Sequence, residues 1–189
     1  MHQSGGENVL VSGLVSAMTE SLRVLGVGKQ QYQQIAVQPS PNPPLAAGDV
    51  QGVIERIQQD YQQAYFVTGV IDDSIYDQGC TFVDPTVQFS GLDLWKRNLQ
   101  LLVPFFINPR IELMSISSLG PNSQGAEQIQ AEWTLDTVIS LPWRPRVSIL
   151  GSTIYTLNSD ANKVVRHVES WNVSAWQALL QIVTPGPRQ

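Results

Sequence analysis

Residues 80–106 read CTFVDPTVQFSGLDLWKRNLQLLVPFF. Residues 81–83 are β-branched or aromatic and indicate a short strand, which Pro85 ends because proline cannot donate a hydrogen bond to a sheet. From residue 92 to residue 106 the apolar side chains recur at helical spacing over a wide face, which predicts a helix that is buried on more than one side. A strand, a tight turn and a broad helix thus follow one another in one short stretch.

The segments on either side of this stretch define the fold class. Asp49 is a candidate helix N-cap, and apolar residues follow it at helical spacing as far as Tyr65. Ser90, with Asp93 three residues later, resembles a capping box that opens the helix at 92–106. Beyond that helix, four long runs alternate apolar and polar residues with period two, which is typical of half-buried antiparallel strands. We therefore expect an α+β fold in which a curved antiparallel sheet wraps around helices and encloses a pocket.

Composition narrows the possible functions. The chain has 189 residues, of which 42% are hydrophobic and 14% are charged, enough for a domain with a full core. A net charge of -5 would repel phosphate backbones, so we expect no nucleic-acid partner. Cys80 is the only cysteine, so we expect no internal disulfide, no zinc site and a reducing compartment. No motif indicates a cofactor.

The chain divides into an N-terminal extension, residues 1–48, and a domain, residues 49–185. Within the extension, residues 8–25 form a possible amphipathic helix, and residues 26–48 are a linker rich in glutamine and proline. We interpret the extension as a tail that packs loosely on the domain, with a partner-binding helix as the alternative. Its first residues lack the charge pattern of a secretory signal, and no run of 18 apolar residues could form a transmembrane segment.

His167 is the first candidate for catalysis, because histidine titrates near neutral pH and suits proton transfer. Glu169 lies on the same face of the strand, two residues along, and could orient the ring. Asp84 before Pro85 could act as a general base or as a partner of His167. The alternatives are a histidine that is satisfied within the sheet, and an aspartate that bonds nearby backbone amides in a turn.

Aromatic residues are the candidates for binding. They could line a small-molecule pocket or simply fill the core; these residues are Tyr76, Trp95, Trp133, Tyr155 and Trp171. Trp143 is held between Pro142 and Pro145, so it could act as a lid or contact a partner, with Arg144 and Arg146 binding an acidic group. Apolar residues on both faces of the strand around residues 149–155 favour a homodimer through the sheet.

The sequence also resembles a known family over roughly residues 50–175. The resemblance is carried by Ile75-Tyr76 with Phe82–Pro85, Phe89–Leu92, Leu141–Pro145, Gly151–Thr153 and His167–Trp171. These segments resemble an uncharacterised family of cyanobacteria and chloroplasts, domain of unknown function 2358, within the nuclear-transport-factor-2-like (NTF2-like) and SnoaL-like superfamily. One position departs from it, because Asn172 stands where such proteins often have aspartate.

The resemblance implies a cone-shaped fold and, as a compartment, the cytoplasm of a cyanobacterium or the chloroplast stroma. Proteins with this fold include enzymes and non-catalytic binding modules, so the fold does not choose among them. We expect a pocket that binds a small apolar ligand. The alternatives are an isomerase, dehydratase or cyclase that uses His167, and a dimeric interaction or assembly module.

Overall fold

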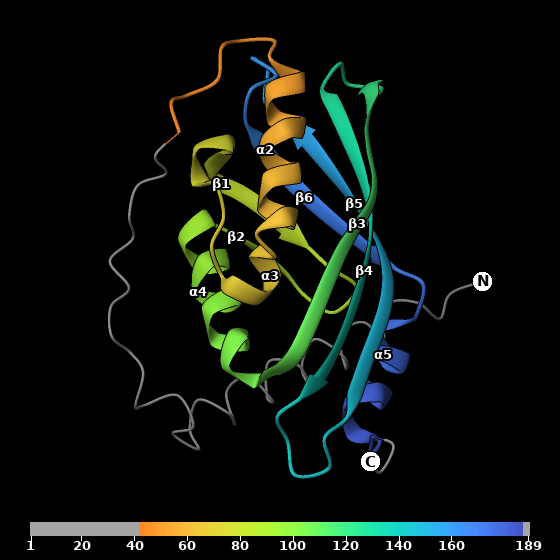
Figure 1. The fold of residues 1–189 in the computed structure, drawn as a ribbon. Helices are drawn as coiled ribbons and strands as arrows, with labels where there is room; N and C mark the ends of the chain where they lie inside the picture. Colours follow the sequence, from red (N-terminus) through yellow and green to blue (C-terminus); the bar gives the residue numbers. More distant parts are fainter. Residues whose placement is uncertain (1–41, 187–189) are drawn as a thin grey trace, which may run out of the picture.

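The structure, a computed structural model, describes residues 42–186. A single six-stranded sheet in the order β2-β1-β6-β5-β4-β3 curves around three helices (Figure 1). The predicted helix at 8–25 and most of the linker lie outside the described residues. The strands are β1 (Tyr76–Val83), β2 (Gln88–Ser90), β3 (Phe106–Pro121), β4 (Glu127–Ile139), β5 (Arg146–Leu157) and β6 (Val164–Trp171).

The helices lie on two sides of the sheet. Helices α2, α3 and α4 lie on the concave side and close the cone, whereas α5 lies beside β5, away from these three helices (Figure 1). Asp49 caps α2 as predicted, because its carboxylate accepts a hydrogen bond from the backbone amide of Gly52. The helical segments are α2 (Val50–Gln62), α3 (Tyr65–Thr68), η1 (Asp73–Ile75), α4 (Leu92–Leu102), η2 (Val103–Phe105) and α5 (Ala175–Val183).

The predicted α+β cone is confirmed, with two corrections. The sheet is mixed, because β1 pairs with β6 in parallel, whereas the other pairs are antiparallel. The N-cap of α4 is Gly91, without a side-chain hydrogen bond, so the capping box predicted from Ser90 and Asp93 is wrong. Gly91 has a φ of 110°, a conformation that glycine adopts without strain, and the hydroxyl of Ser90 instead lies 3.0 Å from that of Thr81.

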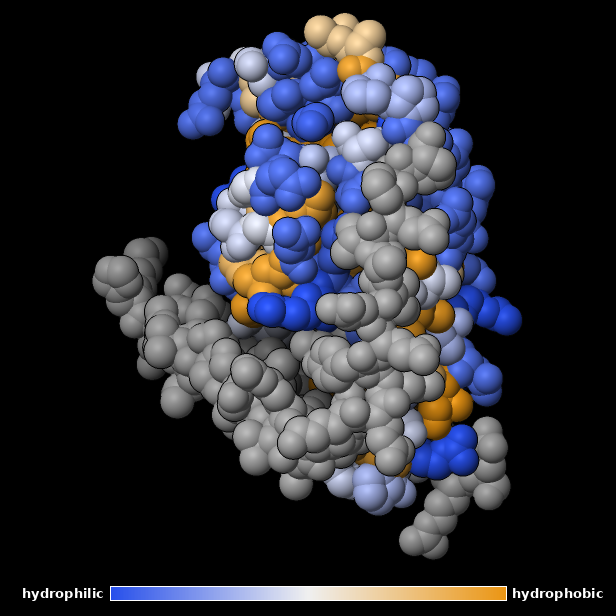
Figure 2. Space-filling view, turned by 90° about the vertical axis from the view of Figure 1, so that its left-hand side faces the viewer, coloured by the Kyte–Doolittle hydropathy of each residue, from blue (hydrophilic) through white to orange (hydrophobic). Residues whose placement is uncertain are grey.

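The alternation of side chains along each strand decides which of them face the helices. Along β4, the residues from Ile129 to Thr137 alternate between buried and partly exposed, and β5 does the same from Val147 to Leu157. Registered pairs such as Ile129 with Tyr155 therefore place two inward side chains together. The residues of β4 and β5 that point to the opposite face of the sheet are mostly polar. On the side of the molecule that carries α4, the surface that is coloured in Figure 2 is mostly hydrophilic, with some apolar patches.

Aromatic side chains fill the inside of the cone. Phe82 and Trp95 stack with ring centroids 4.2 Å apart, and Tyr76 contacts both of them. Two hollows on the described part of the chain lie outside the cone, one beside α5 and one beside the start of α2. Of the aromatic residues that the sequence assigned to a pocket wall, Tyr76 and Trp95 pack against each other, and Trp133 and Tyr155 are also buried, as in a core, whereas Trp171 is only partly buried.

Candidate functional site

A histidine, a glutamate and a tryptophan meet on the inner face of β6. Nε2 of His167 lies 3.0 Å from Oε1 of Glu169, and the indole nitrogen of Trp171 donates to the other carboxylate oxygen at 3.3 Å. Alternation along β6 brings the three side chains to one face, as the sequence predicted. The side chains are long enough to meet although their backbone positions are two residues apart. Glu169 therefore orients the imidazole, and Trp171 in turn orients Glu169.

The imidazole of His167 is enclosed by aromatic rings. Phe82 is its registered partner on the parallel strand β1, and Tyr155 is its partner on β5. The centroids of the Phe82, Trp95 and Tyr155 rings lie 5.4, 5.2 and 4.9 Å from the centroid of the imidazole. Only 2% of His167 is exposed to solvent, so water is excluded from the ring.

The second ring nitrogen of His167 is unpaired. Nδ1 is buried and has no hydrogen-bond partner among the described residues. Since Glu169 accepts only from a protonated Nε2, the pair favours the neutral tautomer that carries its proton there. That tautomer leaves a lone pair on Nδ1, directed into an aromatic environment. A buried polar atom without a partner costs about 1–3 kcal/mol, so its presence calls for an explanation.

Two hydrogen-bonded pairs lie deeper in the cone. The hydroxyl oxygens of Tyr61 and Tyr155 are 3.3 Å apart, and the indole nitrogen of Trp133 donates to the hydroxyl of Thr153 at 2.8 Å. Burial raises the pKa of the Tyr61 and Tyr155 hydroxyls above the ordinary value, so both stay protonated and can donate. The sequence suggested Tyr155 and Trp133 as pocket residues, but Tyr61 and Thr153 carried no signal beyond an apolar helix face and an inward strand position.

Asp84 lies beside this site without bonding to His167. Its carboxylate accepts hydrogen bonds from the backbone amides of Thr86 and Val87, at 2.6 and 2.9 Å, which is the turn arrangement named as the alternative. Burial raises the pKa of Asp84, hydrogen bonds from Thr86 oppose that shift, and the nearby charge of Glu169 adds to it. The partner of His167 is therefore Glu169, whereas Asp84 closes the turn after β1.

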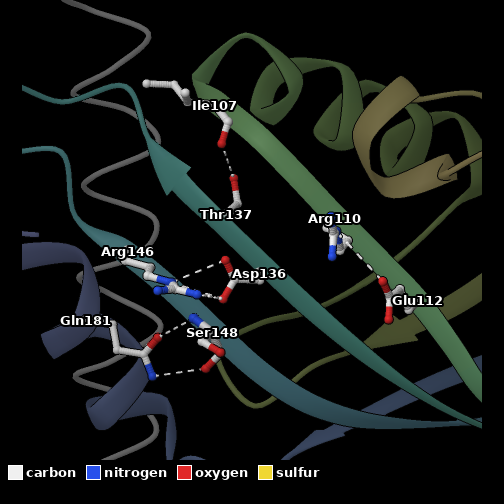
Figure 3. Close-up of polar contacts among 8 residues, drawn as sticks. All are labelled: Ile107, Arg110, Glu112, Asp136, Thr137, Arg146, Ser148 and Gln181. Atoms are coloured by element: carbon white, nitrogen blue, oxygen red, sulfur yellow. Dashed lines mark hydrogen bonds and ion pairs between the residues drawn. The ribbon is translucent and has the colours of Figure 1, made fainter. Parts of the chain in front are cut away.

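Trp143, Arg144 and Arg146 lie elsewhere, at the end of the molecule that carries α5. The indole nitrogen of Trp143 donates to the backbone oxygen of Ile182, which fastens the loop to α5. The guanidinium of Arg146 pairs with the carboxylate of Asp136 through contacts of 2.8 to 3.3 Å (Figure 3). Arg144 has a φ of 44° in the tight turn between them. These residues do not lie against the His167 site.

Asn172 has a structural role in this chain. Its side-chain oxygen accepts a hydrogen bond from the backbone amide of Leu150 at 2.9 Å, and its backbone amide donates to the backbone oxygen of Leu150. An aspartate could accept the same bond. Among residues 42–186, no group of three or more histidine, cysteine or acidic side chains is placed to hold a metal ion, and no helix in that range could span a bilayer.

Solved structures with the same architecture define the class of protein. A putative SnoaL-like polyketide cyclase from Jannaschia sp. aligns with a TM-score of 0.55 at 12% identity, over 77% of this chain and 98% of its own. An NTF2-like protein from Burkholderia thailandensis aligns with a TM-score of 0.56 at 7% identity, over 72% of this chain and 98% of its own. A hypothetical protein with a ketosteroid isomerase-like fold from Catenulispora acidiphila, solved with trimethylamine, aligns with a TM-score of 0.51 at 11% identity, over 67% of this chain and 91% of its own.

These likenesses establish an NTF2-like fold. At such low identities they say nothing further about activity. The model of the family described as "uncharacterized conserved protein (DUF2358)" matches residues 51–167, and the chain belongs to that family. No curated protein matches the sequence.

Proposed function

We propose that this protein binds a small, largely apolar molecule inside the cone, and that the molecule donates a hydrogen bond to Nδ1 of His167. The observation that carries the proposal is the buried, unpaired Nδ1 within a ring of aromatic side chains. A ligand hydroxyl or amide would remove the penalty of the unpaired nitrogen. The surrounding rings would supply apolar contact area for the rest of the ligand.

Entry of such a ligand requires a side chain to move, because aromatic rings now occupy the interior. Trp171 and Glu169 are the half-buried members of the site, whereas the rings around His167 are buried. We propose that the ligand enters beside Trp171 and displaces that indole first. The fold supports the proposal only in general, in that pockets of this kind occur in the mouths of curved sheets.

Proton transfer is a second candidate function, favoured by the contact between His167 and Glu169. A carboxylate that fixes the tautomer of a histidine and leaves the other nitrogen as a base is a recurring arrangement in general-base catalysis. The Tyr61 and Tyr155 hydroxyls would be the nearest buried donors for a developing negative charge. A cyclase, dehydratase or isomerase reaction would use this chemistry.

Ligand binding is tested by native mass spectrometry of the purified protein beside its His167→Phe variant. Phenylalanine replaces the imidazole with an aromatic ring that has no nitrogen, so the variant should stay folded and lose any ligand that co-purifies with the native protein. A screen of small aromatic alcohols and amides by saturation-transfer NMR extends the test to ligands lost in purification. Thr137→Val, which removes a buried hydroxyl where β4 pairs with Val147 of β5, is the matched control. Equal binding by His167→Phe would refute the proposal.

Proton transfer needs a separate measurement. Once a ligand is found, exchange of its carbon-bound protons with deuterium oxide should be faster with the native protein than with Glu169→Gln. If a ligand binds without any exchange of its carbon-bound protons, binding remains the function and a role of His167 as a general base is excluded. The homodimer through the sheet face, and the cyanobacterial or chloroplast compartment, stay predictions; light scattering tests the former.

A further inference from the structure

Helix α5 differs from the long helices α2 and α4 in having no charged residue. It reads AWQALLQIV over Ala175–Val183 and begins at a capping box formed by Ser174 and Gln177. Its inner side packs on the domain, where Ala178 is buried. Gln181 on the same helix bonds to the backbone of Ser148 on β5 (Figure 3).

The outer side of α5 is also apolar. Trp176, Leu180 and Val183 are 55%, 43% and 58% exposed, and their spacing of four and three residues places them on one face. Trp143 extends this stripe, because its indole bonds to Ile182 and 41% of it is exposed. A hollow of about 450 Å³ runs along the helix beside Leu180, with Val173 and Pro185 among its walls. We call Trp143, Trp176, Leu180 and Val183 the α5 stripe.

A helix that is apolar on both sides is normally covered on both sides. Exposed apolar groups that cluster mark a surface that another element contacts. The described stretch from Ser170 to Gly186 contains no charged residue. Arg146 also lines the hollow, but its charge is paired with that of Asp136. The missing cover should therefore be apolar and close to neutral.

We infer that residues 8–25 of the same chain form a helix that packs on the α5 stripe. In that segment six apolar residues share one face at helical spacing: Val11, Leu14, Val15, Met18, Leu22 and Leu25. Its charged residues are Glu20 and Arg23, which cancel. The segment thus has an apolar face that needs a partner, and the α5 stripe is an apolar face that remains exposed in the described part of the chain.

The connection is long enough for this contact. Residues 26–41 number 41 − 25 = 16 and span up to about 50 Å when extended, and a helix of 18 residues adds about 27 Å. The described domain has 186 − 41 = 145 residues, a size that gives a radius of gyration of about 15 Å and half a circumference of about 60 Å. Residues 8–25 can therefore reach α5, although the start of the described chain and α5 lie on opposite sides of the domain (Figure 1).

Tethering also favours the same chain over a second copy. A linker of about this length holds its segment at an effective concentration on the order of millimolar. A separate molecule at micromolar concentration would compete poorly for the same apolar stripe. The expected state is thus an intrachain contact between the extension and the domain.

Disulfide trapping in the full chain tests the inference. Met18→Cys lies at the centre of the apolar face of the segment, and Leu180→Cys lies in the α5 stripe. The native Cys80 is buried and should not interfere. At sub-micromolar protein under mild oxidation, this pair should form an intrachain disulfide about tenfold faster than the matched pair Glu20→Cys with Leu180→Cys, because effective concentration favours the facing pair.

The outcomes separate the possible covers. A fast intrachain disulfide in the first pair alone supports the inference. Interchain disulfides would assign the stripe to a second copy, and equal rates for the two pairs would mean that no specific contact exists; either result overturns it. A second test needs no cysteine: Leu14→Asp with Leu22→Asp should speed hydrogen exchange of the α5 amides severalfold, and unchanged exchange would also overturn the inference.

Discussion

The side-chain amide of Gln181 makes the two hydrogen bonds to the backbone of Ser148 that a neighbouring strand would make. Its oxygen accepts from the Ser148 amide at 2.9 Å and its nitrogen donates to the Ser148 oxygen at 3.4 Å (Figure 3). Strand β5 runs past the end of β6 at this point, because Gly151 is paired with the last residue of β6. One side chain therefore covers an edge that would otherwise be free.

Gln181→Ala should uncover this edge. We expect a loss of about 1 kcal/mol in the free energy of unfolding, since exposed hydrogen bonds contribute modestly, and a greater tendency to self-associate through β5. Urea denaturation and light scattering measure the two effects. Gln62→Ala changes an exposed glutamine on α2 and is the control. If both variants behave alike, the edge does not depend on Gln181.

Gly151→Ala should destabilise the domain, because a methyl group there would overlap the indole of Trp133. Overpacking of this kind costs about 1–3 kcal/mol in the free energy of unfolding. Gly79→Ala is the matched control, since its added carbon would meet only the Asp77 carboxylate, at 3.3 Å. Thermal and urea denaturation give the comparison. A Gly151→Ala protein as stable as the control would mean that the Trp133 ring can shift freely.

Asp60→Asn should stabilise the protein increasingly as pH rises. Burial raises the pKa of Asp60 from 3.8 to about 7, opposed by the hydrogen bond from the Asp72 amide and reinforced by the charges of Asp72 and Asp73. Between those two pKa values the unfolded chain has released this proton and the folded chain has not. Stability is therefore lost as pH rises from about 4 to 7, whereas asparagine does not titrate.

The gain from Asp60→Asn should grow by about 2.5 kcal/mol between pH 5 and pH 8, according to the linkage between proton binding and folding. Urea denaturation of both proteins at the two pH values measures it. Asp93→Asn, an exposed position on α4, controls for the change in net charge. A gain that is equal at pH 5 and pH 8 would contradict the assignment of a raised pKa to Asp60.

The neutral ring of His167 should carry its proton on Nε2, because Glu169 accepts from that nitrogen. Long-range proton–nitrogen correlation spectra distinguish the two neutral tautomers directly. In Glu169→Ala the acceptor is absent, so we expect a mixture of tautomers with the domain still folded. A native protein with its proton on Nδ1 would exclude the lone pair on which the proposed hydrogen bond depends.

Cys80 should be inert in the folded protein. Burial raises the pKa of its thiol to about 12, and the thiolate is the reactive form. Reaction with a chromogenic disulfide reagent should therefore be at least about a hundredfold slower without denaturant than in 6 M urea, on the order expected from thiolate fraction and access. Rapid reaction of the native protein would indicate that β1 opens readily.

Short-range patterns predicted much of this fold. The N-cap at Asp49, the alternation along β4 and β5, and the shared face of His167, Glu169 and Trp171 all follow from the helical period and the strand period. These features depend on neighbours in the sequence. They were therefore accessible without knowledge of tertiary contacts.

The remaining features depend on residues far apart in the chain. Phe82 and His167 pair in parallel although 167 − 82 = 85 residues separate them, and no local pattern distinguishes that pairing from an antiparallel one. The same holds for the contact between Tyr61 and Tyr155, and for the attachment of Trp143 to Ile182. Packing of the aromatic rings, which fills the expected pocket, likewise follows from summed side-chain volumes and not from periodicity.

The parallel pairing of β1 with β6 has a consequence for biosynthesis. A nascent polypeptide that has emerged only as far as β5 lacks the central strand between β1 and β5, so β1 and β2 have no place in the sheet. Contacts between such distant segments form slowly, and intermediates that await them expose apolar surface. Folding of this domain should therefore be completed only after β6 has been synthesised, which makes the growing chain a natural client of ribosome-associated chaperones.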